Sequence, residues 1–208
     1  MAESVKKGKF IGLAGIDGSG KSTQAELLTG YLNQRGSDTI LQEGDRVVAS
    51  HVSTLLAKRH GQNTGMEYLG EDSYLLCHAF DVLQEITNDV MPYVYQGTNV
   101  VVPRTPYCRL AGGLRRGANT VEKAKEVMLF NGEPDLIIWL DIEPELAQLR
   151  IMSRSLEMTS LTRLANYRRA FEIVLTGVKH TRIDCGEMNV AEVQSKIVEV
   201  VDSYLLNN

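Results

Sequence analysis

The chain has 208 residues, of which 43% are hydrophobic and 23% are charged, and its formal net charge is −4. This length allows one large core and predicts a single domain over residues 1–208. The slight negative charge disfavours nucleic-acid binding, and no apolar run reaches the length of a membrane span. The three cysteines are widely spaced. We therefore expect free thiols and a cytoplasmic location.

A glycine-rich loop near the N-terminus is the most informative motif. Residues 15–22 match the phosphate-binding pattern G-x-x-x-x-G-K-[ST]. The loop follows an apolar run at residues 10–14 and precedes a helical pattern at residues 23–35. Backbone amides and the helix N-terminus of such a loop bind phosphates, and the alternative is a chance glycine-rich turn. The predicted ATP-binding residues are Gly15, Ile16, Asp17, Gly18, Ser19, Gly20, Lys21, Ser22 and Thr23.

Short apolar or β-branched runs alternate with helical patterns along the chain, which indicates a parallel sheet with helices on both faces. Strands are predicted at residues 10–14, 39–41, 98–102, 134–141 and 181–184. Helices are predicted at residues 23–35, 47–59, 72–95, 121–130 and 164–175, after Pro144, and from Val190 onward. The fold class is therefore α/β, a three-layer P-loop NTPase sandwich with about five parallel strands.

Polar residues that follow the strands mark the ligand edge of such a sheet. Residues 42–46 follow the second strand, and Arg104 follows the third strand, where it suits a phosphate or is an ordinary strand-end cation. On the helix at residues 72–95, small and polar side chains recur on one face. This row consists of Cys77, Asp81, Gln84 and Asn88. It forms either a substrate-facing row or a solvated surface.

The ordered set of features resembles the thymidylate kinase family of nucleoside monophosphate kinases over most of the chain. The resemblance rests on residues 10–24, Leu75-Leu76, Gly97 with the strand ending at Arg104, Pro134-Asp135 leading to Leu140-Asp141, and Ile183-Asp184-Cys185. It implies transfer of the γ-phosphate of ATP to a nucleoside monophosphate, with Mg²⁺ and with thymidylate as the default acceptor. It also implies a lid near residues 150–165 and a possible homodimer.

The departures from the family pattern concern the acceptor. Only Glu43 remains of the family's Thr-Arg-Glu-Pro-Gly-Gly segment, so Arg46 is at best a displaced substitute for its arginine. Pro103 stands where the family has the aspartate that helps to hold the Mg²⁺ water shell. Cys77 and Asp81 align with the phenylalanine that stacks on thymine and the arginine that binds the base.

The resemblance assigns roles to the remaining residues. The predicted catalytic groups are Lys21, Asp17, Arg104 and the lid residue Arg154, with Arg150 and Arg163 as further lid candidates. The predicted adenine-side residues are Arg150, Asp184 and Cys185. The predicted acceptor site consists of Glu43, Arg46, Cys77, Asp81, Gln84 and Arg104, and Ser22 is the predicted metal ligand. Each lid arginine has an alternative as a solvated helix charge.

Two further hypotheses concern the acceptor and the reaction. An ionised Asp81 only accepts hydrogen bonds, which favours an amino-bearing acceptor over thymine, unless Asp81 pairs with Arg46 or Arg104 instead. The acceptor is then another nucleotide or a small non-nucleotide molecule. A nucleotide-hydrolysing switch is the alternative from another class, but the chain has no guanine-reading Asn-Lys-x-Asp motif.

Overall fold

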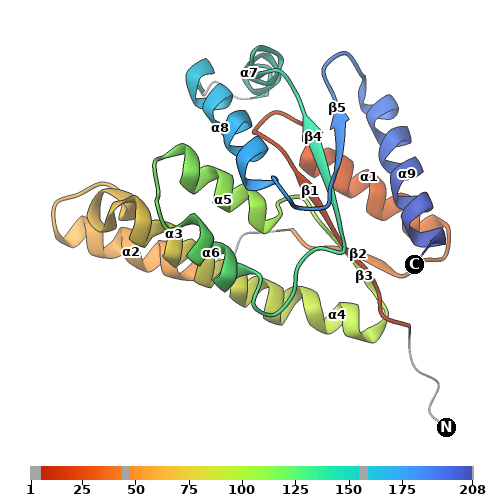
Figure 1. Cartoon of the computed structure of the whole chain (residues 1–208), viewed down its shortest axis with the longest axis horizontal. Coiled ribbons are helices and arrows are strands. Elements are labelled where there is room, and N and C mark those ends of the chain that lie inside the picture. The colour runs from red at the N-terminus through yellow and green to blue at the C-terminus, as the bar shows by residue number, and fades with distance from the viewer. Residues whose placement is uncertain (1–5, 44–46, 155–158, 208) are drawn as a thin grey trace, which may run out of the picture.

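The computed structural model describes residues 6–43, 47–154 and 159–207. Five parallel strands form one sheet in the order β2-β3-β1-β4-β5 (Figure 1). The strands are β1 (Phe10–Ala14), β2 (Thr39–Leu41), β3 (Asn99–Val102), β4 (Leu136–Asp141) and β5 (Thr181–Asp184). This arrangement confirms the predicted parallel α/β sandwich.

Helices connect the strands and cover both faces of the sheet (Figure 1). They are α1 (Lys21–Gln34), α2 (Val48–Arg59), α3 (Gly65–Glu85), a π-helical turn η1 (Ile86–Val90), α4 (Met91–Gln96), α5 (Pro106–Arg115), α6 (Val121–Met128), α7 (Pro144–Met152), α8 (Leu161–Val174) and α9 (Val190–Leu206). No helix in the described part of the chain is long and apolar enough to cross a membrane.

The three central strands, β3, β1 and β4, are almost unbroken apolar runs because both faces of the sheet are buried there. On β1, Phe10 and Ala14 belong to the core on one face, which α3 to α6 and α8 complete. Ile11 and Leu13 belong to the core on the opposite face, which α1 and α9 complete. The loop after β1 therefore begins at the middle of a sheet that is fixed from both sides.

The predicted helix at residues 72–95 is interrupted in the structure. Helix α3 begins at Gly65, where the Thr64 side chain accepts a hydrogen bond from the Glu67 amide. Gly70 has non-helical φ and ψ angles of 75° and 165°, so the uninterrupted part of α3 begins close to the predicted residue 72. The α-helical pattern gives way to η1 before Pro92. Proline has no amide hydrogen to donate to the preceding turn, so a break in the regular pattern at this point has a local cause.

Helix α5 was not predicted, because Gly112 and Gly113 lower helix propensity. The structure shows why a glycine occupies position 113. A Cβ atom there would lie 2.7 Å from a methyl carbon of Leu75 on α3, so any side chain at position 113 would force the buried Leu75 side chain to move. Packing between the two helices thus overrides the local preference.

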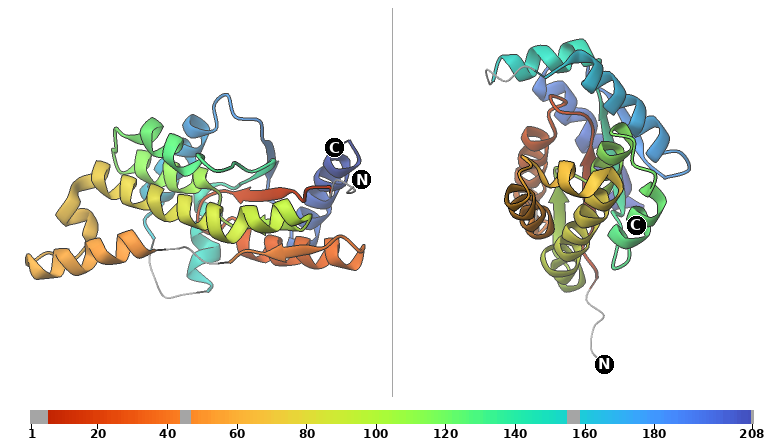
Figure 2. Two further views of the ribbon diagram at one scale, coloured as in Figure 1. Left: turned by 90° about the horizontal axis from the view of Figure 1, so that it is seen from below. Right: turned by 90° about the vertical axis from the view of Figure 1, so that its left-hand side faces the viewer.

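Asp81 caps a neighbouring helix, which corrects its predicted role at the acceptor. Its side chain is 4% exposed. One carboxylate oxygen accepts a hydrogen bond from the Ala49 amide at 2.8 Å, and the other accepts from the amide and the hydroxyl of Ser50, both at 3.2 Å. These donors lie in the first turn of α2, which packs along α3 (Figure 2). A buried carboxylate at a helix N-terminus satisfies amides that have no partner within the helix.

Replacing Asp81 with alanine should therefore destabilise the fold. The amides of Ala49 and Ser50 would lose their acceptor, and the Ser50 hydroxyl would keep only the Val47 carbonyl oxygen at 3.2 Å. We expect the free energy of unfolding to fall by about 2 kcal/mol. Urea denaturation at neutral pH measures this change. The matched variant Ser50→Ala removes only one of the donors and should cost less. Equal stability of Asp81→Ala and the unchanged protein would contradict the capping role.

Candidate active site

The phosphate loop lies between β1 and α1, at the carboxyl end of the sheet. Gly18 and Gly20 have φ angles of 85° and 96°, in the left-handed region that glycine adopts without strain. A Cβ atom on Gly18 would also lie 2.6 Å from the carbonyl oxygen of Ala147 on α7. The loop sequence is therefore required by its backbone conformation and by close contact with α7.

Lys21 is buried at the start of α1, with 5% of its surface exposed. Its ammonium donates hydrogen bonds to the carbonyl oxygens of Gly15 and Ile16, both at 2.8 Å. Burial lowers the pKa of Lys21 to about 8. The amine is thus held inside the loop with a pKa close enough to neutrality for its charge to depend on pH.

Two hydroxyl groups of the loop fit a polyphosphate. Ser19 Oγ is buried and has no hydrogen-bond partner among the described residues, which is costly unless a ligand supplies one. Ser22 is exposed in the first turn of α1, beside the helix N-terminus. The loop therefore offers a cation, an unused buried hydroxyl, an exposed hydroxyl and a helix end to phosphate oxygens and their metal ion.

Asp17 and Arg104 connect the loop to the end of β3. Arg104 Nη2 lies 3.2 Å from a carboxylate oxygen of Asp17. Burial raises the pKa of Asp17, but the charges of Lys21 and Arg104 outweigh this effect, so the pKa lies below its ordinary value. Asp17 is therefore ionised at neutral pH, and both predicted residues lie next to Lys21.

An arginine-rich cavity of about 270 Å³ opens beside Asp17, between α3, α5 and α8. We call it the arginine cavity, and its lining residues are Asp17, His78, Arg104, Cys108, Arg109, Gly112, Arg115, Arg116, Arg163 and Tyr167. Of these residues, the sequence predicts a role in the site only for Asp17, Arg104 and, as a lid candidate, Arg163. The other members were missed because they come from the unpredicted helix α5 or were given no role, as His78 was.

The predicted acceptor residues on α3 do not line the arginine cavity. Cys77 is half-buried, but its neighbour His78 reaches the cavity instead. Gln84 is exposed, and its side-chain oxygen accepts a hydrogen bond from Asn88 at 3.0 Å. Arg46 lies outside the described residues. Of the predicted acceptor residues, the structure brings only Arg104 to this cavity.

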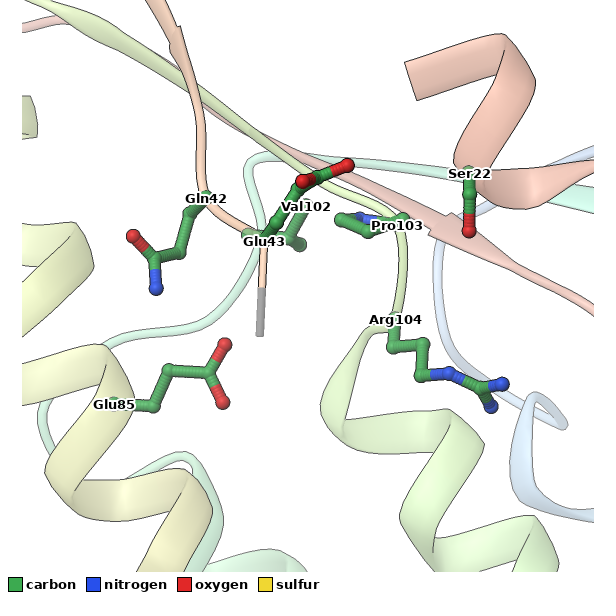
Figure 3. Close-up of a pocket in the computed structure, with 7 residues that line it drawn as sticks. All are labelled: Ser22, Gln42, Glu43, Glu85, Val102, Pro103 and Arg104. Atoms are coloured by element: carbon green, nitrogen blue, oxygen red, sulfur yellow. The ribbon is translucent and has the colours of Figure 1, made fainter. Parts of the chain in front are cut away.

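A second cavity of about 240 Å³ surrounds Pro103, and we call it the Pro103 cavity. Its lining residues are Ser22, Gln42, Glu43, Glu85, Val102, Pro103 and Arg104. Figure 3 shows Glu43 on one side of Pro103 and Ser22 on the other. Carboxylate and hydroxyl oxygens suit Mg²⁺ or the water bound to it. The described residues contain no group of three or more histidines, cysteines, aspartates or glutamates that could hold a metal without a ligand's help.

The predicted adenine-side residues lie together. Arg150 on α7 donates a hydrogen bond to the carbonyl oxygen of Cys185 at 3.0 Å. Asp184 is exposed at the end of β5, and it accepts a hydrogen bond from the Gly186 amide at 2.9 Å. Burial raises the pKa of the Cys185 thiol to about 12, so this thiol stays protonated.

The two lid arginines differ in position. Arg154 is exposed just after α7 and does not line the arginine cavity, whereas Arg163 on α8 does. The structure therefore brings Arg163, rather than Arg154, next to Asp17 and Arg104. A catalytic role for Arg154 stays a prediction.

Helix α8 is fixed by buried polar contacts. Arg168 donates to both carboxylate oxygens of Asp141 at 2.8 and 2.9 Å, and Arg182 donates to one of them at 2.5 Å. Burial raises the pKa of Asp141, but the hydrogen bonds and charges of Arg168 and Arg182 outweigh this effect, so the pKa lies below its ordinary value and the carboxylate stays charged. Tyr167 donates to the Cys108 carbonyl oxygen at 2.8 Å. These bonds join α8 to β4, β5 and α5, and they position Arg163.

A strand, a glycine loop and a helix in this geometry, at the centre of a parallel sheet, define a P-loop nucleotide-binding protein. The family model described as thymidylate kinase matches residues 13–197. The chain belongs to the thymidylate kinase family, whose members are nucleoside monophosphate kinases that use ATP.

Individual relatives agree with this assignment over almost their whole length. The chain is 27% identical to a thymidylate kinase of Francisella philomiragia, with 94% of this chain and 98% of the relative covered. It is 25% identical to a thymidylate kinase of Legionella pneumophila, with 97% of each covered. It is 30% identical to a probable thymidylate kinase of Pyrococcus abyssi, with 96% of this chain and 98% of the relative covered.

The pKa of Lys21 predicts how nucleotide binding depends on pH. Phosphates bind the protonated ammonium, and raising the pH through about 8 neutralises this group in the free protein. ATP binding must then take up a proton, so affinity should fall by up to about tenfold per pH unit above this value. Calorimetric titration between pH 6.5 and 9.5 measures the change.

The matched variant Lys21→Ala should bind ATP more weakly at neutral pH and show no such decline. An affinity of the unchanged protein that stays constant across this pH range would contradict the role of Lys21 at the phosphates.

Proposed function

We propose that this protein transfers the γ-phosphoryl group of ATP to thymidylate, which gives ADP and thymidine diphosphate. The observation that carries the proposal is the arginine cavity directly beside the phosphate loop, in a chain of the thymidylate kinase family. Phosphoryl transfer depends mainly on positioning and on neutralising charge. A donor loop that adjoins a cationic acceptor cavity meets both needs.

The described residues divide the work between donor and acceptor. Lys21 and the loop amides bind the β- and γ-phosphates, and Ser22 is the ligand for Mg²⁺. When bound, Mg²⁺ neutralises charge on the β- and γ-phosphate oxygens. An acceptor phosphate oxygen attacks the γ-phosphorus, and the bond from this phosphorus to the ADP oxygen breaks. Arg104 and Arg163 neutralise the transferring group, because both line the arginine cavity together with Asp17.

The carboxylates around the phosphate loop have separate proposed roles. Asp17 orients the acceptor and holds Arg104 through the ion pair at 3.2 Å. Glu43 takes over the contact to Mg²⁺-bound water that an aspartate at position 103 would make, since it lines the Pro103 cavity with Ser22. Arg150, Asp184 and Cys185 form the adenine side of the donor site.

An amino-bearing acceptor was expected because Asp81 could accept its hydrogen bonds. The Asp81 carboxylate is instead buried against the first turn of α2. Thymidylate therefore remains the acceptor that family membership favours. Another nucleoside monophosphate remains the second candidate, because Cys77 offers no aromatic surface for stacking.

The setting of the reaction is part of the proposal. We place it in the cytoplasm, where reduced thiols such as those of the three cysteines are stable. We also propose a homodimer. Its support is the family and a row of exposed apolar side chains on α2, which are Val48, Val52, Leu55 and Leu56.

A coupled assay of ADP release tests the proposed function. The purified protein is supplied with ATP, Mg²⁺ and one of several acceptors, which include thymidylate, the other deoxynucleoside monophosphates and small hydroxylated metabolites. We expect thymidylate to give the highest kcat/KM. ADP release that is independent of any acceptor would indicate a hydrolysing switch, and a clear preference for another acceptor would refute the thymidylate assignment.

The magnesium requirement tests the role of Glu43. We expect Glu43→Gln to raise the Mg²⁺ concentration for half-maximal activity by about tenfold, because groups that hold metal-bound water tune metal affinity. A Mg²⁺ titration at saturating ATP measures this. The control variant is Glu126→Gln, at an exposed position on α6. An unchanged Mg²⁺ requirement in Glu43→Gln would remove Glu43 from the metal site.

A further inference from the structure

One face of α5 forms a wall of the arginine cavity. The lining residues from this helix and its C-cap are Cys108, Arg109, Gly112, Arg115 and Arg116. Spacings of three, four and seven residues place them on one side of the helix. The only carboxylate among the residues that line the cavity is Asp17, and it already pairs with Arg104. The cavity therefore offers many hydrogen-bond donors and few acceptors.

Arg115 is the member of this wall with unused capacity. Its Nε atom is buried and has no hydrogen-bond partner within the described residues. Its guanidinium carbon lies 5.4 Å from the centre of the Tyr167 ring. Burial and the neighbouring charges of Arg163 and Arg116 lower its pKa. The guanidinium therefore lies among other cations, and a ligand oxygen in the cavity would compensate its charge.

Arg116 provides a contrast within the same helix end. Its Nε donates to a carboxylate oxygen of Glu71 at 2.8 Å, so its charge is compensated inside the protein. Arg115 shows no such carboxylate contact within the described residues. Of these two adjacent arginines, the structure thus commits Arg116 to α3. The guanidinium of Arg115 lines the cavity without a carboxylate partner among the described residues.

Gly112 leaves room in front of these groups. A Cβ atom there would meet only Arg116 Nη1 at 3.5 Å and Tyr167 Oη at 4.0 Å, which are ordinary contacts. Close packing therefore does not require this glycine, in contrast to Gly113 against Leu75. Tyr167 is fixed by its hydrogen bond to Cys108. The space next to Arg115 is open, and the hydrogen bond of Tyr167 fixes one of its walls.

The position of Arg115 along α5 indicates which end of an acceptor it meets. Helix α5 starts next to Arg104 and the phosphate loop, and Arg115 is its last residue. The rise along nine residues is about 13 Å, which the backward lean of the side chain shortens. This separation is close to the length of a nucleoside monophosphate. With the acceptor phosphate at Arg104, the base lies toward Arg115.

We propose that Arg115 determines acceptor specificity by donating a hydrogen bond from its guanidinium to a carbonyl oxygen of the acceptor's base. This inference rests on the proposed function, since it takes the acceptor to be a pyrimidine nucleotide such as thymidylate. A guanidinium donates and never accepts, so it selects ring carbonyl oxygens over ring amines. The base is thereby read from α5 and not from α3.

The test compares a whole acceptor with one that lacks the base. Thymidylate affinity is measured by calorimetry, and deoxyribose 5-phosphate is measured as a competitive inhibitor of thymidylate phosphorylation. In Arg115→Met, which keeps the bulk of the side chain without its donors, we expect thymidylate to bind about tenfold to a hundredfold more weakly. Affinities for deoxyribose 5-phosphate and ATP should change less than twofold.

Two further variants keep the outcome interpretable. Arg115→Lys retains the charge but lacks the planar guanidinium with its several N–H donors. It should therefore also bind thymidylate more weakly while keeping the melting temperature of the unchanged protein. Arg169→Met, at an exposed position of α8 outside the arginine cavity, should leave all three affinities unchanged.

Each contrary result has a distinct meaning. Equal losses for thymidylate and deoxyribose 5-phosphate would show that Arg115 contacts the phosphate, which overturns the inference. Unchanged thymidylate binding in Arg115→Met would overturn it as well, and would leave the proposed function intact. An unchanged protein that binds ATP but no pyrimidine monophosphate would refute the proposed function and this inference together.

Discussion

The phosphate loop packs so closely against the middle of the sheet that its path is almost completely determined. A Cβ atom on Gly15 would lie 2.5 Å from the carbonyl oxygen of Leu140 on β4, and one on Gly18 would lie 2.6 Å from that of Ala147 on α7. Neither gap can widen without moving a buried strand or helix. Every group that the loop presents is therefore fixed relative to β4 and α7, including the Lys21 ammonium.

The acceptor side has the same kind of rigidity, but it is built from helices. The contact of Gly113 with Leu75 draws α5 against α3, and the bond from Tyr167 to Cys108 holds α8 against α5. Asp141 binds α8 to the sheet through Arg168. The arginine cavity lies between these three helices, so its cations face one another although they come from distant segments. Preorganised charge of this kind is an effective means of stabilising phosphoryl transfer.

Much of the fold follows from the sequence. The strands at residues 10–14, 39–41 and 181–184 were predicted with the bounds that the structure shows. For residues 10–14 the signal is an apolar run, which is typical of a buried parallel strand. The loop motif also has a local basis, because its glycines are needed for its own backbone. The same local signals do not predict α5, because Gly113 suggests a turn, whereas in the structure it lies at the contact with another helix.

The acceptor site could be predicted much less well. Helical spacing placed Asp81 on a polar face of α3, but it carries no information on which element lies opposite, and in the structure this is the first turn of α2. Likewise, the sequence does not distinguish Arg115 from other cations at helix ends, because its surroundings depend on the packing of α8. The role of a residue can be predicted from the sequence where it depends on one local segment. It cannot be predicted in this way where it depends on how three helices pack together.

The central claim is that one rigid site brings an ATP loop and a thymidylate cavity together in line. Binding of a bisubstrate molecule, in which adenosine and thymidine are joined through a chain of five phosphates, tests this most directly. Calorimetry with the unchanged protein should give an affinity at least about a hundredfold above that for ATP alone, because linking two ligands makes the second binding event intramolecular. An affinity no greater than that for ATP would show that the cavity beside the loop does not bind the thymidine nucleotide.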